Sequence, residues 1–447
     1  MWQPFNDRGA QLSGLRFGPI LRLRHVAQRA GWGVADQGLN SLTNFAVGVF
    51  VARELGPADF GAFSLAFATY LFALNASRGL ATDPLVVRFS GASTEDWRQA
   101  AAAATGTAAV VGTAVGICCV VAAVVLGGTL ESAFLALGIL LPGLLLQDSW
   151  RFVFFAARRG RDAFLNDLVW ACFLGPFIAA VMVSGHVQVL WFVLAWGGAA
   201  LAAGLVGTAQ ARVLPRLSLV GGWHRAHRDL GIRYLSENLS FSGATQLRSY
   251  GLGAIAGLAA VGALRGAELL LGPVNLVIMG IGSLMAIPEA ARLAQHDLAR
   301  LRRFVVGLAI LLGAAGAIWG LVVLLLPDGF GHRLLGSTWE PAAALVLPIT
   351  VMTVLLGVWS AAWTGLRAMG AARRSLRAQL FGASAFLIGS LAGAALGGAY
   401  GAAWGSAAGN LAATCIWWRQ FQLATRERAQ TRPAADDALA PRAVTQT

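Results

Sequence analysis

The 447-residue sequence predicts an all-α polytopic membrane protein with twelve transmembrane helices, and two patterns support this. Apolar stretches of about 20 residues recur along the chain, each long enough for a helix to cross a hydrocarbon core of roughly 30 Å. Nearly all of the arginine falls in every second gap between them. With 57% hydrophobic and 12% charged residues, too little polar surface remains for an ordinary soluble domain.

The spans fall into two sets of six, each set starting on the same side of the membrane. The predicted spans of the first lobe (31–211) are 31–53, 60–80, 101–127, 133–156, 164–185 and 188–211. Those of the second lobe (233–420) are 233–257, 266–288, 304–326, 341–365, 376–396 and 398–420. Residues 212–232 would link the lobes on the cytoplasmic side.

The placement of arginine sets the orientation, because cytoplasmic loops carry the excess of basic residues. All 34 basic residues are arginines. Gaps assigned to the outside carry only Arg53, Arg265 and Arg333, each with an acidic residue nearby. We therefore predict a multi-pass protein with both termini in the cytoplasm. The net charge of +13 is spread over the inner rim, so it favours lipid headgroups over nucleic acid as the partner.

The two ends of the chain are polar. Residues 1–30 are expected to form a cytoplasmic arm, either disordered or lying as a helix in the inner interface. Residues 421–447 lack apolar periodicity and are expected to form a disordered cytoplasmic tail.

A weak internal repeat supports the two-lobe division. Shifting the chain by 206 residues lays the first six spans on the last six, with Gly56 on Gly262 and Pro142 on Pro348. Such a parallel repeat places a transporter's substrate site between the halves. Glycine also recurs at every fourth position from Gly389 to Gly409, which predicts close packing of the last two helices.

Polar residues inside the spans mark where function is expected, since charge in hydrocarbon is costly. Asp36, Asn40 and Asn44 are four residues apart and therefore share one helical face. Span seven is the most polar, and it includes Glu237 and Gln246. We expect the polar faces of these two spans to line one central cavity.

Arg248 is the strongest binding candidate, because it lies near mid-membrane with no acidic residue within one turn of its own span. A guanidinium there suits bidentate capture of phosphate or carboxylate, and an ion pair with Asp36 or Glu237 is the alternative. Arg78 and Arg151 are further cationic candidates. The alternatives for Arg151 are an intrahelical pair with Asp148 or neutralisation by Asp167 or Asp83.

No catalytic, metal or cofactor site is predicted. The chain has no lysine and hence no phosphate-binding GxxxxGK[ST] loop, and its histidines and cysteines are scattered. We therefore do not expect an enzyme. Trp150, Trp359 and Trp363 fall inside spans, where a ring packs against neighbours or, in a cavity, stacks on a sugar.

Two stretches resemble a known family. The segment ARELGPADFGAFSLA (52–66), within 32–87, resembles the opening spans of bacterial polysaccharide flippases in the multidrug, oligosaccharidyl-lipid and polysaccharide exporter superfamily. The segment LLLQDSWRFVFFAARRGRDAFLND (144–167) resembles their fourth span and the basic turn after it.

The resemblance implies a V of two six-helix lobes, as in the MATE-like fold, and alternating access in the bacterial inner membrane. It implies flipping of a polyprenyl-diphosphate-linked oligosaccharide for cell-surface polysaccharide synthesis, with Arg248, Arg78 and Arg151 near the diphosphate. Membrane lipids and a glycan polymerase or glycosyltransferases are the other expected partners. One alternative is a cation-coupled exporter of small amphiphiles, with Asp36 as coupling site. The other is a non-transporting scaffold for glycan synthases.

Overall fold

A computed structural model describes residues 19–281 and 286–439, and these form helices with no strand. The apolar runs form helices because no water is available in the bilayer core, and a helix satisfies its own backbone hydrogen bonds. The helices of the first half are α1 (Pro19–Glu54), α2 (Pro57–Ser77), α3 (Asp83–Phe89), α4 (Thr94–Leu126), α5 (Gly128–Ala156), α6 (Gly160–Val183) and α7 (Val189–Ala211).

The second half begins with a short 3₁₀ turn at Leu217–Leu219 and has the same sequence of long helices. Its helices are α8 (Val220–Ala256), α9 (Leu258–Gly280), α10 (Ile287–His296), α11 (Leu298–Leu324), α12 (Asp328–Leu335), α13 (Trp339–Ala343), α14 (Val346–Ala368) and α15 (Ala372–Leu439).

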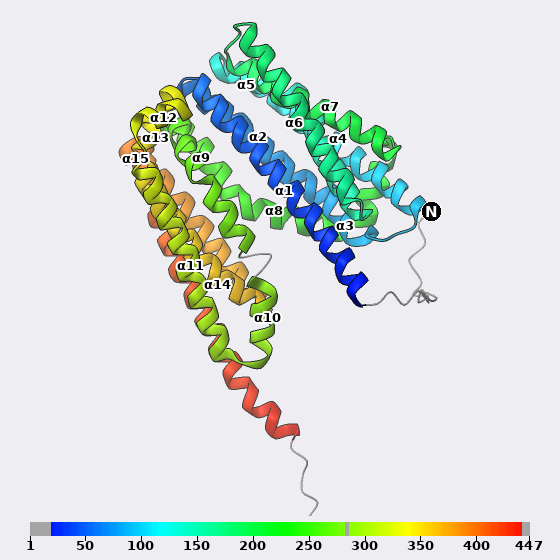
Figure 1. Ribbon diagram of the computed structural model, residues 1–447, viewed down its shortest axis with the longest axis vertical. Helices are drawn as coiled ribbons and strands as arrows, with labels where there is room; N and C mark the ends of the chain where they lie inside the picture. The colour runs from blue at the N-terminus through cyan, green and yellow to red at the C-terminus, as the bar shows by residue number, and fades with distance from the viewer. Residues whose placement is uncertain (1–18, 282–285, 440–447) are drawn as a thin grey trace, which may run out of the picture.

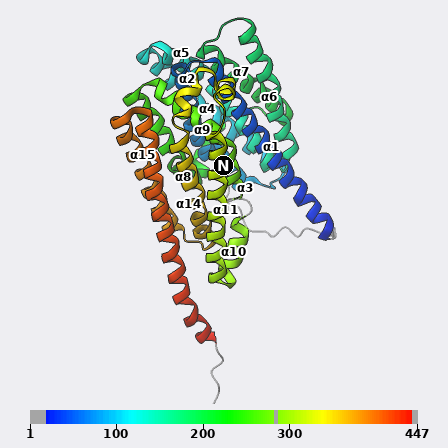
Figure 2. The same ribbon diagram turned by 60° about the vertical axis from the view of Figure 1, so that its left-hand side comes forward.

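The helices form two bundles arranged as a V (Figure 1). Helices α1–α7 make the N-lobe, and α9–α15 make most of the C-lobe. The bundles converge at the end that carries α12 and α13 and diverge toward the end that carries α10 and both ends of the described chain. Helix α8 passes from the N-lobe to the C-lobe, and the turned view in Figure 2 shows it among the central helices.

Within the described ranges, nine helices are long and apolar enough to cross a membrane. The last of them, Ala372–Gln430, contains two spans, because Gly397 and Gly398 have non-helical dihedral angles and the chain reverses there. Helices α1 and α8 occupy the first and seventh predicted spans, and their polar residues keep them out of the nine. Counting these three additional spans gives the predicted two sets of six.

The reversal at Gly397 and Gly398 produces a tightly packed helical hairpin. A Cβ atom on Gly393 would lie 2.0 Å from the Gly401 carbonyl oxygen, and one on Gly405 would lie 2.0 Å from that of Gly389. Only glycine allows backbones to approach this closely. The close packing predicted from the every-fourth glycine pattern is confirmed.

The two halves align in the structure with a different residue offset from the one predicted. Helix α2 follows Gly56 and α9 follows Gly257, so the equivalent positions are 201 residues apart there and not 206. In the next helix pair, Gly112 lies against Pro142 and Gly316 against Val354. Pro142 therefore corresponds to Val354, and its predicted match with Pro348 is wrong, because loop lengths differ between the halves.

Helix boundaries also extend beyond the predicted spans. Helix α1 begins at Pro19, so the described part of the 1–30 arm continues span one. The linker at 212–232 is mostly the start of α8, with a kink at His227 (φ −124°). Helix α15 reaches Leu439, where we predicted a disordered tail from 421. Residues 1–18 and 440–447 lie outside the described residues.

Candidate functional site

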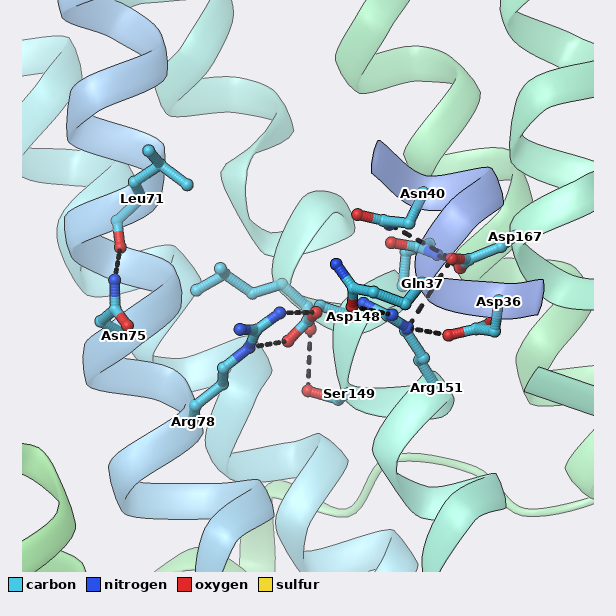
Figure 3. A network of polar contacts seen from close by, with 12 residues as sticks. Asp36, Gln37, Asn40, Leu71, Asn75, Arg78, Asp148, Ser149, Arg151 and Asp167 are labelled. Carbon is cyan, nitrogen blue, oxygen red and sulfur yellow. Dashed lines mark hydrogen bonds and ion pairs between the residues drawn. The ribbon is translucent and has the colours of Figure 1, made fainter. Parts of the chain in front are cut away.

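A network of buried charges joins α1, α5, α6 and the turn that follows α2 in the N-lobe (Figure 3). Arg151 of α5 donates from Nε to Asp36 of α1 and from Nη2 to Gln37, at 2.9 Å in the second case. Asp36 is fully buried and Arg151 is 5% exposed. The predicted intrahelical pair of Arg151 with Asp148 is wrong, because α1 brings a carboxylate directly against the guanidinium.

Asp167 of α6 completes this part of the network. Its Oδ2 atom lies 3.7 Å from Arg151 Nε and accepts a 3.2 Å hydrogen bond from Asn40, while Oδ1 accepts one of 2.7 Å from Gln147. Asn44 in turn donates to Asn40 Oδ1 at 3.2 Å. The polar face predicted from the four-residue spacing therefore exists, and it faces the other N-lobe helices at Asp36 and Asn40.

Arg78 pairs with Asp148, the third carboxylate of this network. It forms a bidentate pair with Asp148, with Nε to Oδ2 at 3.0 Å and Nη2 to Oδ1 at 2.6 Å. Arg78 begins a π-helical turn (Arg78–Thr82) that interrupts the α2 to α3 path, a feature frequent at functional sites. The network thus contains the aspartates 36, 148 and 167 but only two arginines. One negative charge is in excess when all five groups are ionised.

The start of α8 docks on the N-lobe beside this network. Asn238 donates to Asp83 at 2.9 Å, Trp223 Nε1 donates to the Leu80 carbonyl at 3.1 Å, and Arg88 pairs with Asp229 at 2.7 Å. Glu237, predicted as a coupling or counter-ion group, is exposed and forms no ion pair with a described residue.

The second charged cluster lies in the C-lobe around Arg248. Arg248 of α8 forms an ion pair with Glu268 of α9, and Arg265 lies 3.5 Å from the same carboxylate. Its predicted alternative partners, Asp36 and Glu237, are not in contact with it. The cluster contains two arginines and one glutamate, so its net charge is +1, opposite in sign to that of the N-lobe network.

Arg248 lies on the wall of a cavity of about 290 Å³ between α8, α9, α14 and α15. Arg248 is 1% exposed, and its Nε and Nη1 atoms have no hydrogen-bond partner among the described residues. An unsatisfied buried donor costs free energy, and more so when it is charged. The guanidinium is therefore prepared to donate to an anionic or polar ligand. Phe386 covers it, with the ring centre 5.2 Å from Cζ.

Smaller cavities continue from this one toward the N-lobe. One of about 50 Å³ is lined by Gln246, Arg248 and Arg265, and one of about 10 Å³ by Asn44 and Arg265. Asp36 lines none of the three cavities described. The prediction of a single central chamber shared by Asp36, Asn44 and Arg248 is therefore wrong for Asp36. Buried ion pairing removes its carboxylate from the space between the lobes.

Sequence reasoning missed the partner role of Glu268. We assigned Arg265 to an outer gap and took Glu268, at the start of the predicted span 266–288, as its acidic neighbour, whereas both lie well inside α9, which begins at Leu258. Two signals for their place inside a helix were available: Arg265 and Glu268 are three residues apart, and a long apolar run follows them. No pattern in the chain could show that α9 packs against Arg248.

Comparison with solved structures identifies the architecture. One similar structure is described as an inward-facing conformation of a multidrug resistance MATE family transporter of the MOP superfamily. It has a TM-score of 0.68 and 14% identity, over 89% of this chain and 99% of that one. The fold is that of the MATE transporters.

A second structure with this fold is the lipid II flippase MurJ in an inward closed conformation, with a TM-score of 0.67 and 8% identity over 89% of this chain and 90% of that one. An outward-facing conformation of a multidrug resistance MATE family transporter gives a TM-score of 0.52 at 14% identity, over 91% and 96% of the chains. Comparisons with family models and with curated proteins give no match. The MATE fold explains the V of Figure 1 and its two six-helix lobes.

Proposed function

We propose that this protein is a flippase of MATE fold that moves a polyprenyl-diphosphate-linked oligosaccharide across the bacterial inner membrane by alternating access. Both termini would face the cytoplasm, and the substrate would come from membrane-bound glycosyltransferases and go to a glycan polymerase. The physical task is to carry a charged, hydrophilic headgroup through an apolar medium, which needs a polar or cationic cavity at membrane depth.

The observation that carries the proposal is the state of Arg248. Two of its buried nitrogens lack partners and its guanidinium lines a cavity of about 290 Å³. A diphosphate supplies acceptor oxygens in the geometry that arginine binds bidentately. Arg265 adds a second cation within the cluster. Arg78 and Arg151 each donate from Nε and Nη2 to neighbouring side chains, whereas Arg248 donates only from Nη2, to Glu268. We therefore assign diphosphate binding to Arg248 and not to the other two candidates.

The arrangement of the lobes supports alternating access. The bundles diverge at the end that bears the arginine-rich turns, which the positive-inside rule places in the cytoplasm (Figure 1). The higher TM-score with an inward-facing transporter, 0.68 against 0.52 for an outward-facing one, agrees with this orientation. The cavity beside Arg248 would then load from the inner leaflet.

The test is translocation of a fluorescent lipid-linked oligosaccharide in vesicles containing the purified protein. Arg248→Ala should abolish transport while the variant elutes and melts as a folded protein. Arg248→Lys, which keeps the charge near Glu268 but loses the planar fork, should retain only partial activity. Arg333→Ala, at an exposed site on α12, is the matched control and should transport normally. Normal transport by Arg248→Ala would contradict the assignment.

A cation-coupled exporter of small amphiphiles is the second candidate, and the surplus carboxylate of the N-lobe favours it. Asp36, Asp148 and Asp167 face only two arginines, so one carboxyl group is available for a proton or sodium ion. Drug efflux that is lost in Asp36→Asn, while surface glycan is unaffected, would support this function. Loss of glycan without any effect on efflux would exclude it.

A further inference from the structure

We propose that the C-lobe cavity beside Arg248 is a carbohydrate subsite, in which a pyranose ring of the substrate packs against a wall of aromatic side chains. The inference rests on the proposed function, since it names the part of the lipid-linked substrate that this cavity receives. It assigns the ring faces of the sugar to the tryptophans of α14, and the adjoining phosphate to Arg248.

Much of the cavity lining is aromatic. Trp359, Trp363, Trp417 and Phe386 all line the cavity. Trp359 and Trp417 are stacked, with ring centres 5.7 Å apart and planes inclined by 13°. The axial C–H bonds of a pyranose form a flat apolar face, and that face packs well on an aromatic ring. A free anion alone would need none of these rings.

Trp359 and Trp363 are the rings best placed to meet a ligand. Both are half-buried, whereas Trp417 is only 2% exposed and belongs to the packed core. The indole N–H of Trp359 donates to Asn410 Oδ1 at 3.3 Å, which fixes the ring plane. The Arg367 guanidinium lies 4.9 Å from the Trp363 ring centre and so supports that ring. A rigid ring loses little entropy when a ligand binds.

The cavity is elongated along the helices. Its lining on α14 runs from Met352 to Trp363, which at 1.5 Å per residue spans roughly 16 Å. Arg248 lies level with the Met352 end, because both are within nine residues of the converging ends of their helices. Trp363 and Gln379 lie near the short turn between α14 and α15, at the opposite end. A phosphate at Arg248 would leave a connected sugar running along this wall.

Polar groups are spaced along the same cavity. Gln379 makes no hydrogen bond to a described residue, and Ser360 lies between the two tryptophans with its hydroxyl donating to Gly357. These groups can accept from or donate to sugar hydroxyls while the rings hold the ring face. A lipid tail would not need them, and it can remain in the bilayer.

The test is equilibrium binding to the full-length protein in lipid nanodiscs, with three probes. These are undecaprenyl diphosphate alone, the same lipid bearing one N-acetylglucosamine, and the same lipid bearing one galactose. In the unaltered protein at least one sugar should raise affinity by about fivefold over the bare lipid, within the range of one aromatic contact. Trp363→Ala should remove that gain while leaving the affinity for the bare lipid unchanged.

Two variants separate a sugar contact from a folding defect. Trp363→Phe keeps a ring and should retain most of the gain. Trp404→Ala removes an exposed tryptophan of α15 that does not line the cavity, and it should bind like the unaltered protein. If neither sugar adds affinity, or if Trp363→Ala keeps the full gain, the subsite is overturned while the flippase proposal stands. If the unaltered protein binds none of the three lipids, the proposed function itself fails.

Discussion

Gly61 of α2 and Gly262 of α9 occupy equivalent positions in the two lobes, and each packs against the helix that carries the other. A Cβ atom on Gly61 would lie 1.9 Å from the Leu258 carbonyl oxygen, and one on Gly262 would lie 2.0 Å from that of Pro57. Each glycine therefore packs against the first turn of the other glycine's helix. This reciprocal contact joins the lobes where they converge, and it holds them together in the conformation with the opposite end open.

Substituting Gly61 by alanine should weaken this junction. The methyl group has no room beside the Leu258 carbonyl, and crowding of this kind costs about 1–3 kcal/mol. We expect a lower melting temperature and a larger distance between spin labels on the converging ends of α2 and α9. Gly56→Ala is the matched control, because nothing lies within 4 Å of a Cβ there and φ is −70°. Equal effects at the two positions would show that the junction is not tight.

Removing Arg151 should destabilise the N-lobe through uncompensated charge. Arg151→Met leaves Asp36 and Asp167, both with 0% exposure, without their cation, and such a loss costs about 3–5 kcal/mol. Adding Asp36→Asn removes one of the two stranded charges and should recover part of the stability. Thermal unfolding of both single variants and the double variant measures the coupling. Arg159→Met, which breaks a more exposed pair with Asp162, should have little effect. A double variant no more stable than Arg151→Met would rule out the charge explanation.

Neutralising Glu268 should strengthen anion binding at Arg248. Glu268→Gln removes the negative charge shared by Arg248 and Arg265 and changes the net charge of the cluster from +1 to +2. We expect the affinity for undecaprenyl diphosphate to rise roughly tenfold, which corresponds to about 1.4 kcal/mol. Calorimetric titration in nanodiscs checks this, with Glu289→Gln on exposed α10 as control. Weaker binding by Glu268→Gln would indicate that the carboxylate positions the guanidinium for the ligand.

Acidification should loosen the docking of α8 on the N-lobe. Burial lowers the pKa of His227 below its ordinary value of 6.5, and Arg88 lowers it further, against the Trp223 carbonyl and Asp229. The unfolded chain therefore binds a proton before the folded one. Stability is complete above pH 6.5, falls as the pH decreases below it, and stops falling below the lowered pKa.

Hydrogen exchange of residues 220–232 at pH 5 and pH 7.5 measures this effect. Intrinsic amide exchange is itself slower at pH 5, so the quantity to compare is the protection of each amide relative to its intrinsic rate at that pH. Protection in the unaltered protein should be lower at pH 5 than at pH 7.5, whereas His227→Gln should show a smaller change between the two. His224→Gln alters an exposed histidine on the same helix and should keep the full pH dependence. The same pH response in both variants would place the sensitive group elsewhere.

The local properties of the chain were predictable because they depend on short-range sequence. The twelve spans follow from runs of apolar residues, and the close hairpin of α15 follows from glycines at every fourth position. Orientation is predicted from the arginines of alternate gaps. The resemblance of 52–66 and 144–167 to polysaccharide flippases implied a V of two lobes, and the MATE fold agrees with it.

The pairing of charges was decided only by the packing of helices. The residues Asp36, Arg151 and Asp167 belong to three spans, and nothing in their spacing shows that they meet. Glu268 follows Arg248 by twenty positions across a turn, and the angle at which α9 packs on α8 determines their contact. Sequence alone shows that an ionised group in a membrane needs a partner or water, because leaving it unpaired is too costly. Which partner satisfies it depends on the relative placement of helices, and in this protein that placement keeps Asp36 within the N-lobe and puts Arg248 at a cavity.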